Sequence, residues 1–197
     1  MWAIGNGESR TPINIDKLDG PKSGCNALWR DYYTDYLVCV DRRMVEEALR
    51  GNANTKGTLI YTRPDCVDRY VAKGIRTVPP LPYKGEKRWD EPFQWGSGPY
   101  AVLIAAVFAK EHYVNLIGFD LYSIDGKVNN VYKGTPNYDD AKKRRVDPRY
   151  WIHQIGMIFN CFPNLQFVIY QDNWELPKAW KYHNVKVDTI SNISYNS

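Results

Sequence analysis

Residues 2–10 read Trp-Ala-Ile-Gly-Asn-Gly-Glu-Ser-Arg, so a short apolar run passes directly into a glycine-rich loop. An apolar run of this kind is typical of a buried strand, and glycines after it let the backbone approach a ligand closely. Successive backbone N–H groups, together with the hydroxyl of Ser9, can then receive a phosphate or a ribose. We therefore predict that Gly5, Asn6, Gly7 and Ser9 bind a nucleotide. The alternative is that the glycines only meet the steric needs of a turn from strand to helix.

The rest of the chain alternates between apolar runs and helical patterns. Most of the apolar runs are continuous, which is typical of strands covered on both faces of a parallel sheet. The predicted strands are Trp2–Ile4, Tyr36–Val40, Thr58–Tyr61, Arg76–Val78, Tyr113–Ile117 and Leu165–Tyr170. The predicted helices are Arg42–Leu49, Pro99–Ala109 and Pro148–Phe159. This alternation predicts an α/β fold of Rossmann-like type, with a mostly parallel sheet and helices on both faces.

The length of 197 residues suits one domain, which we place at residues 1–190, with a frayed tail at residues 191–197. Two stretches rich in turn-forming and charged residues predict long loops. One is Pro79–Trp95, and the other is a lid over about residues 123–146 that includes the basic run Lys142–Arg145. Loops of this length inside a domain are commonly functional.

Charge and composition restrict the classes of partner. The net charge of +4 fits a small phosphate-bearing ligand but is too low to indicate duplex nucleic acid. The four cysteines form no C-x-x-C pair, so we predict neither a metal site nor a disulfide framework. No apolar stretch approaches the ~20 residues of a membrane span, and the N-terminus lacks the pattern of a secretory signal. We expect a cytoplasmic protein without a membrane span, and a homo-oligomer is one possibility.

Further polar residues follow predicted strands or precede a predicted helix. Because ligands of open α/β sheets bind at the carboxyl ends of the strands, these residues are candidates for the same nucleotide site. They are Asn26, Asp41, Ser97, Gly98, Asp120 and Tyr122. Asp41 could accept a ribose hydroxyl, and Ser97-Gly98 at a helix N-terminus could bind an anion. The alternatives are local, namely a turn at Asn26 and helix caps at Asp41 and Ser97.

Tyrosines of the lid, Tyr132 among them, are candidates to close over a bound phosphate together with Lys142–Arg145. A basic run is otherwise typical of a solvated surface.

In their order, these motifs resemble the bacterial sialyltransferases of glycosyltransferase family 42. That family has Gly-Asn-Gly-Pro-Ser after its first strand, matched here by residues 5–9, and then Cys-Asn, matched by Cys25-Asn26. Its Ser-Gly before the central helix is matched by Ser97-Gly98, and its Gly-Ile-Asp-Phe-Tyr by residues 118–122. The resemblance covers about residues 1–170. The first loop and the Val-Asp segment at Asp41 also resemble a nucleotide-binding group that includes motility accessory factors and archaeal hydroxymethylpterin diphosphokinases.

The sialyltransferase resemblance implies metal-independent transfer of a sugar from a CMP-activated donor to a glycan acceptor, without a cofactor. The asparagines and serines of the matched motifs would hold the nucleotide, and the lid tyrosines would stabilise the leaving phosphate. The family's catalytic base is a histidine just before the helix that follows the lid, where this chain has Asp147. The nearest histidine, His153, lies about two turns into the predicted helix. Asp147 and His153 are therefore the candidate catalytic residues.

Three functions are consistent with the sequence. The first is a metal-independent glycosyltransferase that uses a nucleotide sugar, with a CMP-sugar favoured. The second is a Mg²⁺-dependent pyrophosphokinase that uses ATP, with carboxylates such as Asp41 and Asp120 as metal ligands. The third is a non-catalytic nucleotide-binding module.

Overall fold

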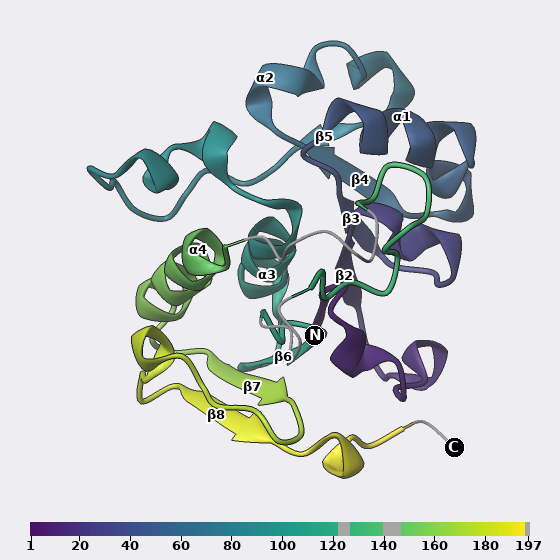
Figure 1. Ribbon diagram of the computed structural model, residues 1–197. Helices are drawn as coiled ribbons and strands as arrows, with labels where there is room; N and C mark the ends of the chain where they lie inside the picture. The colour runs from purple at the N-terminus through teal and green to yellow at the C-terminus, as the bar shows by residue number, and fades with distance from the viewer. Residues whose placement is uncertain (122–126, 140–146, 196–197) are drawn as a thin grey trace.

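The computed structural model describes residues 1–121, 127–139 and 147–195 as an α/β fold built on a parallel sheet (Figure 1). Eight strands within these ranges form the sheet, and all seven pairings between neighbouring strands are parallel. The strands are β1 Trp2–Ile4, β2 Lys22–Cys25, β3 Tyr36–Val38, β4 Leu59–Thr62, β5 Arg76–Thr77, β6 Tyr113–Ile117, β7 Gln166–Tyr170 and β8 Val185–Asp188. The predicted fold class is confirmed.

The strand order is β5-β4-β3-β2-β1-β6-β7-β8. The chain therefore starts in the middle of the sheet, builds outward to β5, and returns to place β6 on the other side of β1. Loops that leave β1 and β6 diverge toward opposite halves of the sheet, which makes this the topological switch point. In open parallel sheets a ligand crevice forms at such a point, outside the carboxyl ends of the strands.

Helices cover both faces of the sheet, as predicted. They are α1 Arg42–Arg50, α2 Pro64–Val67, α3 Ser97–Phe108 and α4 Arg149–Cys161, with short 3-10 turns elsewhere. The helices α3 and α4 lie on one side of the sheet and α1 on the other (Figure 1). Within the described ranges, no helix has the length and apolar character needed to cross a membrane.

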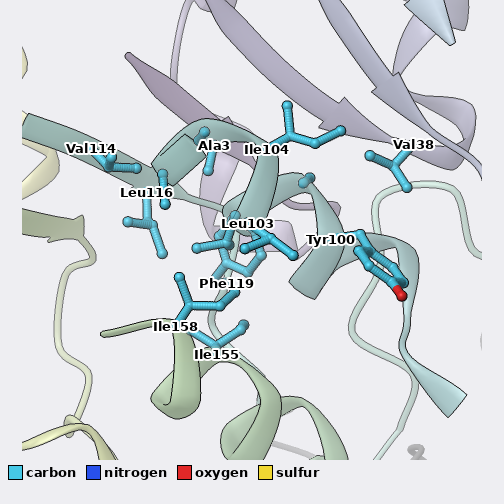
Figure 2. Packing of buried hydrophobic residues seen from close by; sticks show 14 of the residues in the cluster. Ala3, Val38, Tyr100, Leu103, Ile104, Val114, Leu116, Phe119, Ile155 and Ile158 are labelled. Atoms are coloured by element: carbon cyan, nitrogen blue, oxygen red, sulfur yellow. The ribbon is translucent and has the colours of Figure 1, made fainter. Parts of the chain in front are cut away.

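The helix α3 forms the centre of the core because it is packed between the sheet and α4. Every residue of the stretch 100–106 is buried. Leu103 belongs to one apolar cluster with Leu116 of β6 and with Ile155 and Ile158 of α4 (Figure 2). A helix that is apolar all round is stable only in such a fully enclosed position. The packing fixes where its N-terminus lies relative to the ends of the strands.

At the switch point the loop after β1 lies directly against the loop after β6. The N–H of Gly5 donates to the carbonyl of Ile117 at 2.9 Å, and the N–H of Gly7 donates to the carbonyl of Gly118 at 2.9 Å. A β-carbon on Gly5 would lie only 2.2 Å from the carbonyl oxygen of Gly118. Glycine is therefore required at position 5 by the close approach of two backbones.

The sequence analysis located six of the eight strands to within two residues at each end; it gave no range for β2 and missed β8. The β8 sequence Val-Lys-Val-Asp is only partly buried, because β8 is the last strand of the sheet. An edge strand needs no continuous apolar run, and charged side chains are common on it. The continuous-run criterion therefore could not detect it.

The predicted frayed tail is wrong for part of its length. Ile193 is 6% exposed and belongs to an apolar cluster with Trp2 and Leu18. Leu18 and Tyr195 also form an isolated antiparallel bridge. The tail is therefore packed against the first strand up to this point, and residues 196–197 lie outside the described ranges.

We expect Gly5→Ala to lower the free energy of unfolding by about 1–3 kcal/mol or more, because the methyl group overlaps the Gly118 carbonyl. Gly98→Ala is the matched control, since its β-carbon would meet nothing closer than Phe119 at 3.6 Å. In a helix, this exchange should leave stability unchanged or raise it by up to about 1 kcal/mol. Urea unfolding followed by circular dichroism measures both. Equal stabilities for the two variants would contradict the close approach.

Candidate functional site

A cavity of about 420 Å³ lies at the switch point. Its volume falls within the roughly 300–1,000 Å³ typical of sites for small molecules. It is bordered by residues that follow β1, β2, β3, β4 and β6 and by the start of α3. The sequence-predicted residues that line it are Gly5, Asn6, Gly7, Asn26, Asp41, Ser97 and Gly98. Residues chosen because they follow strands are therefore brought together in space.

Asn6 lines this cavity and carries a buried acceptor that is not used. The residue is 8% exposed, and its Nδ2 donates to the carbonyl of Cys25 at 3.1 Å and to Oη of Tyr138 at 3.4 Å. These bonds fix the orientation of the amide, and its buried Oδ1 has no hydrogen-bond partner among the described residues. Leaving a buried acceptor unpaired costs about 1–3 kcal/mol. A ligand that donates a hydrogen bond to Asn6 would recover this cost.

The side chains of Asn26 and Ser97 form a hydrogen bond in the cavity wall, and we refer to this bond as the tie. Asn26 adopts a left-handed backbone with φ of 51°, and its Oδ1 accepts from the hydroxyl of Ser97 at 2.8 Å. The same hydroxyl accepts from the N–H of Val40 at 3.0 Å. The tie thus joins the ends of β2 and β3 to the start of α3. It uses Oδ1 of Asn26 and leaves Nδ2 for a ligand.

The N-terminus of α3 faces the cavity through Gly96, Ser97, Gly98 and Pro99. The first N–H groups of a helix lack partners within the helix and carry a partial positive charge. Here the N–H of Gly96 donates to Oε1 of Gln154 at 3.4 Å, and Pro99 has no N–H. Among the described residues, the N–H groups of Ser97 and Gly98 have no hydrogen-bond partner and therefore remain for an anion.

Arg63 places a cation on the cavity wall directly after β4. Its Nη1 donates to the carbonyl of Phe93 at 2.6 Å, and its Nη2 pairs with Asp65 at 3.1 Å. Its Nε is buried without a partner in the described ranges. The sequence analysis missed Arg63, although it follows a predicted strand in the same way as the residues that were singled out.

Aromatic side chains complete the lining, and the sequence analysis missed these as well. They are Phe93, Trp95, Phe119 and Trp151. Phe93 and Trp95 belong to the loop predicted at Pro79–Trp95, and Trp151 belongs to α4, so no local motif marked them. Flat rings beside polar atoms suit a base or a sugar ring.

Asp120 is buried against the first loop. It is 5% exposed, and its Oδ2 accepts from the N–H of Ser9 at 3.2 Å and from Nδ2 of Asn129 at 2.7 Å. Its Oδ1 occupies the space that a side chain on Gly7 would need, since a β-carbon there would lie 1.5 Å from it. Asp120 therefore fastens the first loop from behind, and it is not among the residues that line the cavity.

Ser9 and Tyr132 also lie outside the cavity lining. The Ser9 hydroxyl is buried without a partner among the described residues. The Tyr132 hydroxyl accepts from Nη2 of Arg10 at 3.0 Å and donates to Oδ2 of Asp31 at 2.7 Å. Burial, together with the bond to Asp31, raises the pKa of Tyr132. Tyr132 therefore supports the first loop rather than contacting the cavity, and Tyr122 and Lys142–Arg145 fall outside the described residues.

The described part of the predicted lid, residues 127–139, is packed along the first loop, and we refer to it as the strap. The carbonyl of Asn6 accepts from the N–H of Val131 at 2.9 Å, and the N–H of Glu8 donates to Oδ1 of Asn129 at 2.8 Å. Tyr132 is buried in the apolar cluster that includes α1. The strap thus lies along the first loop and contributes Asn129 and Asn130 to the cavity wall.

Asp41 stands at the start of α1 with its carboxylate free of the helix. Its backbone carbonyl accepts from the N–H groups of Met44 and Val45, at 2.9 and 3.1 Å. Its side chain forms no capping hydrogen bond. The alternative of a side-chain cap is therefore wrong, and Asp41 is among the residues that line the cavity.

Neither candidate catalytic residue lines the cavity. Nε2 of His153 contacts Oδ1 of Asp90 at 2.5 Å, and the exposed Asp147 pairs with Arg149 at 2.6 Å. A general base must reach the proton that it removes. The helix α4 turns Trp151 toward the cavity, and a residue two positions further lies on the opposite side of a helix. The arrangement therefore gives His153 and Asp147 no position for that role.

Cys25 lines the cavity but is unsuited to act as a nucleophile. Burial raises the pKa of its thiol to about 12, against a smaller lowering effect of Arg10. The thiol therefore stays protonated at neutral pH, and the thiolate is the reactive form. All four cysteines are free, as expected from their spacing.

Comparisons with protein-family models, with curated proteins and with solved structures give no match. In the described ranges, no group of three or more histidine, cysteine, aspartate or glutamate residues is placed to hold a metal ion. The functional argument therefore depends on the geometry of the cavity and on the motifs of the sequence.

The pair formed by Asp90 and His153 joins α4 to the loop that supplies Phe93 and Trp95. Asp90, with its side chain 6% exposed, also accepts from Oη of Tyr83 at 2.9 Å and from the N–H of Lys87 at 3.0 Å. Burial alone would raise the pKa of Asp90. The hydrogen bonds, first among them that to His153, outweigh burial and hold the pKa below its ordinary value of 3.8.

Because the pKa of Asp90 is lower in the folded state, the carboxylate stabilises the fold above its ordinary pKa. This stabilisation is lost as the pH falls through the folded-state pKa. We expect Asp90→Asn to lower the free energy of unfolding by about 1–3 kcal/mol near neutral pH, with a deficit that shrinks in acid. Urea unfolding over a range of pH measures this difference in the free energy of unfolding. Glu91→Gln, at an exposed neighbouring carboxylate, is the control. A deficit independent of pH would contradict the expectation.

Proposed function

We propose that the cavity binds a nucleotide sugar and that the chain is a metal-independent, glycosyltransferase-like protein with a glycan as acceptor. The observation that carries the proposal is the convergence of an unpaired buried acceptor on Asn6 with the free N–H groups of α3. A CMP-sugar is favoured by the resemblance of residues 5–9, Cys25-Asn26 and Ser97-Gly98 to the sialyltransferase motifs.

The phosphate belongs at the start of α3. The N–H groups of Ser97 and Gly98 are aligned with the helix dipole, which favours a negative charge at this end. Arg63, whose guanidinium also pairs with Asp65, lines the same cavity and adds a cation to its wall. During transfer, negative charge accumulates on the leaving phosphate, and donors fixed in advance at that position stabilise it.

The nucleoside belongs beside Asn6 and Asn26. Oδ1 of Asn6 can accept from a ribose hydroxyl or a base amino group, and Nδ2 of Asn26 can donate to a base or ribose oxygen. Both amides are held by protein contacts before any ligand arrives. Such preorganisation lowers the entropic cost of binding.

The two other functions receive less support from the residues. The pyrophosphokinase hypothesis names carboxylates such as Asp41 and Asp120 as Mg²⁺ ligands, and of these two only Asp41 lines the cavity. The Asp120 carboxylate is instead directed under Gly7. A non-catalytic module would have the same nucleotide site, so only turnover separates it from the transferase.

A thermal-shift screen tests the nucleotide site. The ligands are CMP, CMP-sialate, UDP- and GDP-sugars and ATP, each with and without Mg²⁺. We expect CMP compounds to stabilise the protein without metal, by about 2.7 kcal/mol at a hundredfold excess over Kd. Asn6→Ala should abolish the shift, whereas Asn192→Ala, at an exposed asparagine outside the cavity, should retain it. Stabilisation by ATP only with Mg²⁺, or by no nucleotide at all, would contradict the proposal.

Gly98→Ala separates binding from folding. The variant should fold as well as the wild type, because the added methyl group has space. It should nevertheless weaken the affinity for the favoured nucleotide about tenfold, a loss of ~1.4 kcal/mol, by narrowing the approach to the helix N-terminus. Isothermal titration calorimetry measures the change. An unchanged Kd would contradict the proposal that the phosphate binds at this end of α3.

A further inference from the structure

A second compartment of about 240 Å³ adjoins the cavity. The two compartments share six lining residues, which makes them neighbours within one crevice. The shared residues are Asn26, Asp41, Leu121, Asn129, Asn130 and Trp151. A transferase needs its donor and its acceptor in such an arrangement, with the reacting atoms at the boundary.

The second compartment is rich in neutral hydrogen-bonding groups. Nδ2 of Asn137 donates to Glu47, which leaves its Oδ1 as an acceptor. Oδ1 of Asn130 accepts from the N–H of Tyr132, which leaves its Nδ2 as a donor. Arg43 adds an exposed guanidinium on the same wall. A mixture of donors and acceptors fits hydroxyl groups, each of which donates and accepts at once.

Tyr138 contributes an oriented hydroxyl to this compartment. Its Oη accepts from Nδ2 of Asn6 at 3.4 Å and from the N–H of Ala27 at 3.3 Å. The oxygen accepts both of these hydrogen bonds. Its own O–H is therefore left to donate to another acceptor. Burial raises the pKa of Tyr138, so this proton is retained at neutral pH. Trp151 adds an apolar surface on which one face of a sugar ring can pack.

We propose that the second compartment binds a neutral, hydroxyl-rich acceptor and that Asp41 is the general base for the attacking hydroxyl. This inference rests on the proposed function, because it assigns the acceptor and the base of the same transfer. Among the described residues that line both compartments, Asp41 is the one with a titratable side chain. Asp139 lines only the second compartment, and His153 and Asp147 line neither.

The local structure leaves Asp41 available for this task. Aspartate at the start of a helix normally accepts from an N–H of the first turn. Here the side chain forms no such bond, while the backbone carbonyl of Asp41 starts α1. Asp41 is exposed and lines both compartments, within the crevice that would hold both substrates.

The transfer step balances with this assignment. The acceptor oxygen forms a bond to the anomeric carbon of the donor sugar, and the bond between that carbon and the phosphate oxygen breaks. The nucleotide phosphate leaves with the electron pair, toward Arg63 and the N-terminus of α3. The proton of the acceptor hydroxyl passes to a carboxylate oxygen of Asp41. No metal ion and no further reactant enter the step.

The first test is acceptor binding. Galactose, lactose, glucose and maltose are titrated calorimetrically into the wild type, with and without CMP. We expect at least one of them to bind, and Arg43→Ala to weaken that binding about tenfold, the loss of one charged hydrogen bond. Arg42→Ala is the matched control, since it is an adjacent exposed arginine that lines neither compartment. If CMP binds but no saccharide does, the inference fails while the proposed function stands.

The second test is turnover with CMP-sialate and the saccharide that binds, followed by release of CMP. We expect Asp41→Asn to lower kcat by about 10²–10⁴-fold, the range typical of a general base. The CMP affinity should remain within about threefold, because an asparagine at this position keeps an oxygen that accepts hydrogen bonds. Arg43→Ala should raise the KM for the saccharide, with kcat little changed.

The outcomes distinguish the two proposals. A kcat of Asp41→Asn within a few-fold of the wild type would overturn the assignment of the base. Saccharide binding that Arg42→Ala weakens as much as Arg43→Ala would overturn the assignment of the compartment. A saccharide that binds to a protein that no nucleotide stabilises would support the compartment and overturn the proposed function.

Discussion

The contact between the backbones of Gly5 and Gly118 is the constraint on which the rest of the site depends. With 2.2 Å between a β-carbon at position 5 and the opposing carbonyl oxygen, no side chain can separate the loops after β1 and β6. The base of the crevice therefore consists of backbone, and polar side chains are confined to its walls. Asp120 then holds the first loop from behind, through the N–H of Ser9. A site assembled in this way has little freedom to change shape, because its closest contacts join main chain to main chain.

The second constraint is the burial of α3, which links the core to the crevice. Apolar side chains surround this helix, so that it can neither slide nor rotate without opening cavities in the interior. Its N-terminus is consequently held in place by packing that has no direct relation to ligands. Ser97 and Asn26 connect this fixed helix end to the ends of β2 and β3. The interior of the protein thereby determines where an anion would be held.

The sequence predicted the fold well because buried parallel strands carry continuous apolar runs, and β1 and β6 were located to the residue. The rule that ligands lie beyond strand ends singled out Asn6, Asn26 and Asp41, which line the cavity. The rule gives a position along the chain but not the direction of a side chain. This explains why Asp120 was predicted at the site although it does not line the cavity. Its carboxylate turns under Gly7 because that residue has no side chain to exclude it. Arg63 was missed although the same rule could have found it, because it directly follows β4. Tyr132 was misplaced because the strap packs into the apolar cluster that includes α1, and Trp151 carried no local motif. Such features depend on contacts between distant segments, which spacing along a sequence does not encode.

The two edges of the sheet have a consequence for how copies of the chain meet one another. At one edge β5 is only two residues long and exposed, and at the other β8 carries an exposed lysine, Lys186. Short edge strands and charged edge side chains are the devices by which β proteins avoid joining their sheets end to end. Growth of a continuous sheet from molecule to molecule is therefore disfavoured at both ends. Where copies of this chain assemble, helices and loops are the surfaces that remain for the contact.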